Sequence, residues 1–134
     1  MSLYKNDRFE FVKLSVESIL NQTYKHFDFY VQYDGPIREE VDSYLSGLED
    51  ERMRIQKRAE NKGLAQSLND LLNIVMSAGY EYIARMDADD ISELNRFERQ
   101  IQYFDEHRQF SHVHTAIWLI VYSKGNMMAL FAKR

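Results

Sequence analysis

The sequence contains no cysteine among its 134 residues. This absence excludes a disulfide framework, a thiolate nucleophile and any zinc or iron–sulfur site that needs cysteine ligands. A chain without cysteine suits a reducing compartment, so we expect a cytoplasmic protein. The sequence also lacks internal repeats, low-complexity stretches and linkers. We therefore expect residues 1–134 to form a single domain.

The sequence has no excess of positive charge and no long apolar run. Seventeen Lys and Arg against twenty-one Asp and Glu give a net charge of −4, which disfavours binding to a phosphate backbone. We therefore expect no nucleic-acid partner. Every apolar run, including the one near residues 129–132, is far shorter than the roughly 20 residues that cross a bilayer, and no signal peptide opens the chain. We expect a soluble protein, whose missing parts could still bind the inner face of the cell membrane.

Several common catalytic patterns are absent as well. No Gly-x-Ser-x-Gly segment is present, which argues against an α/β-hydrolase. No Gly-x-Gly-x-x-Gly follows a strand-like segment, which argues against a dinucleotide-binding site. The four histidines have no triad or metal-site spacing; they are His26, His107, His112 and His114. We interpret them as surface or strand residues.

The hydrophobic pattern predicts alternating strands and helices. Apolar residues three or four apart predict helices over 8–22, 37–48, 64–78 and 94–104, the third ending at Gly79. A two-residue period predicts a strand over 27–33, and shorter strands are expected at 1–4, 53–57 and 82–86. Strand-like segments over 113–122 and 127–132, separated by the turn residues 123–126, predict a hairpin.

This alternation predicts an α/β fold with a mainly parallel sheet, helices on both faces and a final β-hairpin. Ligands of such sheets bind at the carboxyl ends of the strands. Tyr4, Asp34 and the acidic turn 87–90 all lie at predicted strand ends. Tyr4 could stack on a base or sugar ring, whereas an Asp before a Gly, such as Asp34, is most often an ordinary turn residue.

The acidic turn Asp87-Ala88-Asp89-Asp90 is the strongest candidate for chemistry. Three carboxylates within four residues repel one another unless a cation or hydrogen-bond donors share the site. Oxygen ligands without nearby Cys or His favour Mg²⁺ or Mn²⁺. On spacing alone, an acidic turn that caps the following helix fits equally well. An aspartyl nucleophile is a weaker alternative, and an EF-hand is excluded because Ile91 and Ser92 occupy the positions of a ligand and the turn glycine.

The segment between the second strand and the third helix has charges of alternating sign. We interpret residues 49–62 as a solvated loop surface around a short strand. Asn61-Lys62-Gly63 then precedes a helix, and this position is usually a loop with an N-cap. Lys62 beside a helix N-terminus could also hold a phosphate.

In combination these segments resemble a known family. The stretches SVESILNQTYKHFDFYVQYDGP, ENKGLAQSLND and YEYIARMDADDISELNRFERQI occur in the order and at the spacing typical of the inverting family 2 glycosyltransferases of bacterial cell-surface polysaccharide synthesis. The resemblance covers nearly the whole chain and implies the GT-A fold. It also implies a UDP-sugar donor, a glycan or lipid-linked acceptor, and Mn²⁺ or Mg²⁺ as cofactor.

The resemblance assigns roles to individual residues. It implies that Tyr4 packs on the uracil and that Asp34 hydrogen-bonds to it. Asn61 and Lys62 would border the nucleotide. The remaining roles fall on the acidic turn: Asp87 near the ribose and metal, Asp89 as ligand of the metal bound to the diphosphate, and Arg85 and Asp90 as supports.

The sequence departs from the family pattern in two ways. Tyr33 stands where members usually carry a first acidic residue before the glycine. The family also continues well beyond the predicted hairpin, into a half that supplies the acceptor site and catalytic base. We therefore expect residues 1–134 to be the donor half alone, unable to transfer sugar. The competing hypotheses are a non-catalytic nucleotide-sugar-binding module and a nucleotidyltransferase, although the loop from Lys5 to Arg8 lacks the glycines of the latter.

Overall fold

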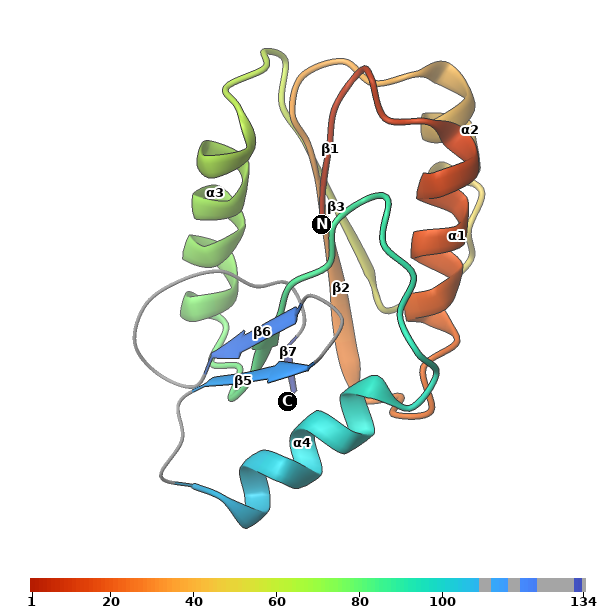
Figure 1. Ribbon diagram of the computed structural model, residues 1–134. Helices are drawn as coiled ribbons and strands as arrows, with labels where there is room; N and C mark the ends of the chain where they lie inside the picture. Colours follow the sequence, from red (N-terminus) through yellow and green to blue (C-terminus); the bar gives the residue numbers. More distant parts are fainter. Residues whose placement is uncertain (109–111, 116–118, 123–131, 134) are drawn as a thin grey trace.

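A computed structural model gives the fold of the chain (Figure 1). It describes residues 1–108, 112–115, 119–122 and 132–133, with side chains for residues 1–108. The elements follow in the order β1 (Ser2–Leu3), α1 (Phe9–Leu20), β2 (Phe27–Tyr33), α2 (Glu39–Ser46), β3 (Met53–Lys57), α3 (Leu64–Ser77), β4 (Ile83–Ala84), α4 (Arg96–Glu106), β5 (His112–Thr115), β6 (Leu119–Tyr122) and β7 (Ala132–Lys133). The predicted α/β class is confirmed.

The sheet is organised around β2. Strands β1 and β3 pair with it in parallel, one on each side, and β1 pairs near its carboxyl end, at Gln32 and Tyr33. Strand β7 pairs antiparallel with the start of β2 and also with β4, which in turn pairs antiparallel with β6. The path through the sheet is β1-β2-β7-β4-β6-β5, with β3 on the other side of β2.

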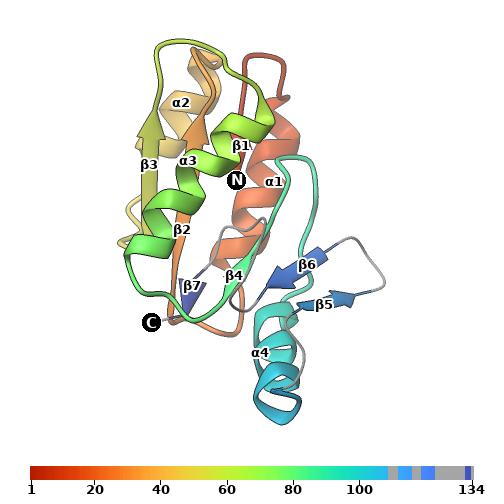
Figure 2. The same ribbon diagram turned by 90° about the vertical axis from the view of Figure 1, so that its left-hand side faces the viewer.

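The two faces of β2 are covered by different helices (Figures 1 and 2). Because side chains alternate along a strand, Phe29 and Val31 join the larger core with α1, α2 and α4, whereas Tyr30 packs with Leu68 and Leu71 of α3. Helices therefore cover both faces of the sheet, as predicted. The alternation also directs the side chain that follows Tyr33 toward the α3 face.

The end of α3 and the buried stripe of α1 show why the sequence folds as it does. Helix α3 ends at Ser77 and is followed by Gly79 with a φ of +76°, the left-handed conformation common after helices. The predicted end at Gly79 is thus confirmed. Helix α1 buries Val12, Val16 and Ile19 on one stripe, which matches the predicted periodicity.

The carboxyl-terminal strands differ from the prediction. The segment predicted as one strand over 113–122 contains two strands, β5 and β6, which pair antiparallel from His112 opposite Tyr122 to Thr115 opposite Leu119. The hairpin is therefore β5–β6, and β7 pairs with β2 and β4. The predicted turn 123–126 and most of the segment 127–132 lie outside the described residues. Strand β4 covers residues 83–84, shorter than the predicted 82–86.

No helix within the part of the chain that the structure describes is long and apolar enough to cross a membrane.

Candidate functional site

Asp34 lies directly after β2, at the edge where β1, β2 and β3 end. Its backbone N–H donates to the carbonyl of Leu3 at 2.7 Å, which ties the end of β2 to the end of β1. The next residue, Gly35, has a φ of +80°, and a Cβ built there would lie 2.8 Å from the backbone nitrogen of Asn61. The chain can therefore turn here, against the loop before α3, only with glycine.

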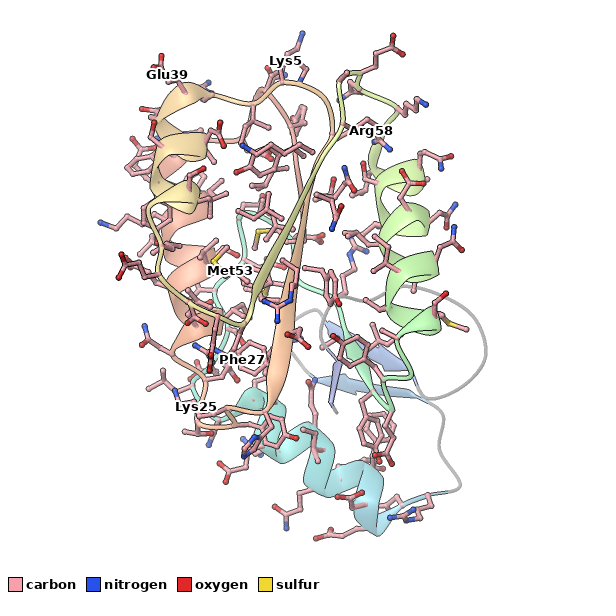
Figure 3. All side chains as sticks on the ribbon, turned by 180° about the vertical axis from the view of Figure 1, so that it is seen from behind. Lys5, Lys25, Phe27, Glu39, Met53 and Arg58 are labelled. Atoms are coloured by element: carbon pink, nitrogen blue, oxygen red, sulfur yellow. The ribbon has the colours of Figure 1, made fainter. Side chains whose placement is uncertain are left out.

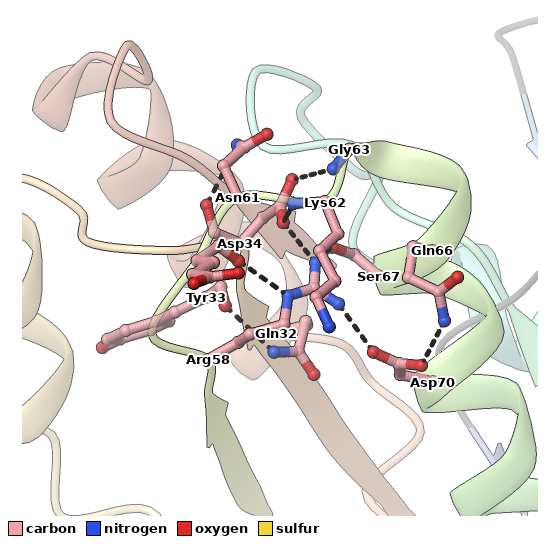
Figure 4. A network of polar contacts seen from close by, with 11 residues as sticks. Gln32, Tyr33, Asp34, Arg58, Asn61, Lys62, Gly63, Gln66, Ser67 and Asp70 are labelled. Atoms are coloured by element: carbon pink, nitrogen blue, oxygen red, sulfur yellow. Dashed lines mark hydrogen bonds and ion pairs between the residues drawn. The ribbon is translucent and has the colours of Figure 1, made fainter.

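The carboxylate of Asp34 is surrounded by hydrogen-bond donors (Figure 4). The backbone N–H of Lys62 donates to Oδ1 at 2.7 Å and that of Gly63 to Oδ2 at 2.9 Å. The guanidinium of Arg58 donates to Oδ1. The side-chain amide of Asn61 donates to the Asp34 carbonyl at 3.1 Å. Three residues singled out in the sequence, Asp34, Asn61 and Lys62, thus meet in one network.

The protonation of Asp34 follows from these contacts. Only 3% of the residue is exposed, and burial by itself would raise the pKa of the carboxyl group. The N–H of Lys62, the Arg58 guanidinium and the N–H of Gly63 outweigh this effect and hold the pKa below its ordinary value. At neutral pH the side chain is a carboxylate, which can only accept hydrogen bonds.

Arg58 is the residue of this site that sequence reasoning missed. Its guanidinium donates to Asp70 Oδ2 and to Ser67 Oγ, both at 2.6 Å, and to the carbonyl of Glu60 at 3.1 Å. Its side chain is only 13% exposed, so the interpretation of residues 49–62 as a solvated surface is wrong at this position. Its position was a usable signal: Arg58 directly follows β3, at the same edge of the sheet at which Asp34 follows β2.

Other charges of this segment also pair with partners elsewhere in the fold. Arg54 contacts the buried Asp28 at 2.9 Å, and Lys57 contacts Asp42 at 2.7 Å. Asp42 also accepts a hydrogen bond from the Tyr33 hydroxyl at 3.1 Å. Tyr33 points into the core with α1 and α2, on the face opposite Arg58. The departure from the family pattern at Tyr33 therefore lies away from the Asp34 network.

Tyr4 begins the loop that follows β1. It is 43% exposed, and its backbone N–H donates to Asp7 Oδ2 at 2.9 Å, which folds the loop back on itself. Burial raises the pKa of Asp7, the hydrogen bond from Tyr4 lowers it, and the negative charge of Asp89 raises it further. This loop therefore lies close enough to the acidic turn for the two carboxylates to interact.

The acidic turn is anchored through Asp87. Arg85 donates from Nη2 to both carboxylate oxygens of Asp87, at 2.6 and 2.8 Å, and from Nε at 3.0 Å. The hydroxyl of Ser15, on α1, donates to the Asp87 carbonyl at 2.9 Å. Asp89 is exposed. Burial raises the pKa of Asp90, and the nearby charges of Asp87 and Asp89 raise it further, whereas Arg85 and Arg96 oppose this rise.

The turn does not cap the following helix. Helix α4 begins at Arg96, its N-cap is Asn95, and no side chain caps it. The alternative interpretation of Asp87–Asp90 as a helix cap is therefore wrong. Buried Arg96 instead reaches back under the turn, where its guanidinium donates to the Arg85 carbonyl at 3.1 Å.

The donor set of the turn can be tested against the divalent ion that the family implies. Within residues 1–108 no three acidic or histidine side chains converge into a ready metal cluster. Both oxygens of Asp87 are paired with Arg85, whereas Asp89 has an exposed carboxylate. One or two carboxylates completed by substrate oxygens is the usual set for Mg²⁺. The residues present therefore fit an ion that arrives with a phosphate ligand, better than a fully protein-bound ion.

The comparisons with known proteins agree on the class of protein. The fold matches a solved mannosyltransferase, PcManGT from Pyrobaculum calidifontis in complex with GDP-Man and Mn²⁺, with a TM-score of 0.72 at 12% identity over 92% of this chain and 43% of that one. The chain thus has the GT-A fold of glycosyltransferases. The sequence profile of Glycosyl transferase family 2 matches residues 3–117. The chain belongs to this family.

Curated relatives support this assignment along most of the chain. An uncharacterized glycosyltransferase of Methanocaldococcus jannaschii is 31% identical over 94% of this chain and 43% of its own length. The amylovoran biosynthesis glycosyltransferase AmsE of Erwinia amylovora is 32% identical over 80% of this chain and 40% of its own length. The chain therefore spans less than half the length of these relatives.

Proposed function

We propose that this chain is the donor-binding domain of a glycosyltransferase that takes a UDP-sugar and, in the full-length protein, transfers the sugar with inversion to a cell-surface glycan or lipid-linked acceptor. Family membership supports the transferase class. The observation that carries the proposal is the meeting of Asp34 with the Asn61-Lys62-Gly63 loop at the carboxyl edge of the sheet, where ligands of such sheets bind.

The base of the nucleotide would be recognised by Asp34 and Tyr4. Uracil presents an imide N–H at N3, which needs an acceptor, and an ionised Asp34 supplies one. Tyr4 is exposed and directly follows Leu3, whose carbonyl accepts a hydrogen bond from the Asp34 N–H. The Tyr4 ring is therefore available to pack on the base. Asn61 and Lys62 would border the nucleotide from the loop before α3.

The diphosphate would be held at the acidic turn. Asp89 is the proposed ligand of Mn²⁺ or Mg²⁺, with Asp87 placed by Arg85 beside the ion or the ribose. When bound, such an ion neutralises the charge that develops on the departing nucleoside diphosphate. Three carboxylates within four residues favour a cation at this position. The Mn²⁺ present in the mannosyltransferase complex supports the same assignment.

The acceptor and the catalytic base are assigned outside this chain. Transfer needs a positioned acceptor hydroxyl and a carboxylate within hydrogen-bond reach to remove its proton. Every residue that we assign belongs to the donor side, so we expect residues 1–134 to bind donor without transferring sugar. The polysaccharide role named for the Erwinia relative supports a glycan acceptor, and synthesis of such glycans from cytoplasmic donors would place the full-length protein at the inner face of the membrane.

A direct test compares uridine recognition in the wild type and in Asp34→Asn. The variant loses the carboxylate and presents an amide to the same donors, so we expect UDP affinity to fall roughly tenfold or more, with or without metal, because a hydrogen bond to a charged group contributes about 1.5–3 kcal/mol. Isothermal titration calorimetry with UDP and with inorganic pyrophosphate separates base from phosphate contacts. Equal losses for the two ligands would contradict a base contact at Asp34.

A further inference from the structure

Arg58 joins two carboxylates that come from different elements of the fold. One Nη of its guanidinium donates to Asp34 and to Ser67 Oγ, and the other donates to Asp70 Oδ2 at 2.6 Å. Asp34 follows β2, whereas Ser67 and Asp70 lie on α3. Figure 4 shows the guanidinium between Asp34 and α3. The planar fork of arginine fixes direction as well as charge.

The far end of the network is held in turn. Asp70 also accepts a hydrogen bond from the side-chain amide of Gln66 at 2.7 Å through its other oxygen. The Nε of Arg58 is held by the Glu60 carbonyl. The guanidinium therefore has little freedom to rotate, and the position of the Asp34 carboxylate is set from α3 as well as from the loop.

The contacts limit what Asp34 can offer to a ligand. A carboxylate has about four acceptor positions. Oδ1 uses two of them for Arg58 and Lys62, whereas Oδ2 uses one for Gly63. One position on Oδ2 is left among these contacts. It is an acceptor, and therefore suits a base edge that offers an N–H group.

We propose that Arg58, held in place by Asp70, is a positioning residue that directs the remaining acceptor position of Asp34 toward the base of the donor nucleotide. This inference rests on the proposed function, in which Asp34 recognises the base. It adds that the selectivity for uracil over cytosine depends on a residue that does not touch the nucleotide. Cytosine has an acceptor at N3, where uracil has an N–H, so a fixed carboxylate discriminates between them.

The chemistry of the buried carboxyl group supplies a readout specific to this role. The groups that face Asp34 are the Arg58 guanidinium from the end of β3 and the backbone N–H groups of Lys62 and Gly63 before α3; Asp70 acts through Arg58. Without the guanidinium, the effect of burial on the pKa of Asp34 is opposed only by the N–H groups of Lys62 and Gly63. The pKa of Asp34 then rises, because the positive charge that favours the ionised form has been removed. A protonated Asp34 could donate to cytosine N3, which would erode selectivity.

The experiment measures the ratio of UDP affinity to CDP affinity between pH 5 and 8 by calorimetry in the presence of Mn²⁺. Both ligands carry the same diphosphate, so its own titration cancels in the ratio. The ratio of each variant is divided by the wild-type ratio at the same pH, which cancels the protonation of cytosine N3 toward pH 5. The variants are Arg58→Gln, Arg58→Lys and Asp70→Asn. Arg99→Gln is the matched control, because Arg99 is an exposed residue of α4. Figure 3 shows this helix at the opposite end of the molecule from Arg58. Circular dichroism and urea unfolding establish which variants fold.

We expect Arg99→Gln to show the wild-type ratio at every pH. In Arg58→Gln the ratio should fall roughly tenfold, and fall further toward pH 5. Arg58→Lys should restore the pH profile of the wild type but only part of the ratio, because lysine keeps the charge and lacks the planar fork of arginine. Asp70→Asn should lower the ratio by a smaller factor.

Two outcomes would overturn the inference. An unchanged ratio in folded Arg58→Gln would show that Arg58 does not set base recognition. If that variant does not fold, an unchanged ratio in both Arg58→Lys and Asp70→Asn has the same meaning. Failure of the proposed function looks different, since the wild type itself would then bind neither nucleotide.

Discussion

Replacing Gly35 by alanine should destabilise the protein more than the addition of one methyl group suggests. Gly35 has a φ of +80°, which an L-residue adopts at a cost of about 1–2 kcal/mol. The added Cβ would also lie 2.8 Å from the backbone nitrogen of Asn61 and 3.2 Å from the carbonyl carbon of Glu60. Both neighbours are backbone atoms, so the loop must move by about half an ångström to reach ordinary van der Waals contact.

That movement acts on the contacts that hold Asp34. The same loop donates to Asp34 from Asn61, Lys62 and Gly63. A neutral hydrogen bond contributes about 0.5–1.5 kcal/mol and one to a charged group about 1.5–3 kcal/mol. Loss of one bond to the carboxylate, with slight weakening of the others, would therefore cost about 2–3 kcal/mol. Together with the backbone strain, we expect Gly35→Ala to lower the free energy of unfolding by about 3–5 kcal/mol.

Gly79→Ala provides a control with the same backbone strain and no collision. Gly79 has a φ of +76°, and nothing lies within 4 Å of a Cβ built there. It should lose only about 1–2 kcal/mol and bind UDP normally. Urea unfolding followed by circular dichroism measures both variants. Equal destabilisation by the two substitutions would refute the argument that the close approach of Gly35 to Asn61 organises the site.

Two further predictions concern the base and the response to acid. Tyr4→Ala should weaken UDP binding by roughly 1–3 kcal/mol, the usual contribution of a base–aromatic stack, whereas Tyr4→Phe should bind as the wild type does; equal losses would point to the hydroxyl instead. The lowered pKa of Asp34 contributes stability above its unfolded pKa near 3.9, and this contribution is lost as the pH falls through the folded value. Asp34→Asn should therefore be destabilised more at pH 7 than at pH 3 in urea unfolding, and a uniform loss would contradict this account.

The local pattern of the sequence was enough to predict most of the fold. The period of two over residues 27–33 matches β2 as observed, and it places Asp34 at a strand end. The apolar stripe from Leu64 and the glycine at position 79 locate α3 within a few residues. These signals are local, because alternation and left-handed glycine depend on neighbouring residues alone.

Features that depend on distant residues were not predicted. Arg58 lies in a stretch of alternating charge that is typical of a solvated surface, and only the packing of α3 on β2 brings Asp70 and Ser67 to it. The segment 112–122 has a uniformly strand-like composition, so its division into β5 and β6 was not evident. The acidic turn offered good capping residues, but five residues separate it from α4.

The measurement that tests the central claim most directly is the metal dependence of UDP binding. Calorimetry with Mn²⁺ and with a chelator, on the wild type and on Asp89→Ala, isolates the exposed carboxylate of the acidic turn. We predict that Mn²⁺ strengthens UDP binding to the wild type at least tenfold, and that Asp89→Ala removes this gain while leaving the weaker, metal-free binding intact. Equal UDP affinity with Mn²⁺ and with the chelator in the wild type would contradict a metal-assisted donor site at this turn.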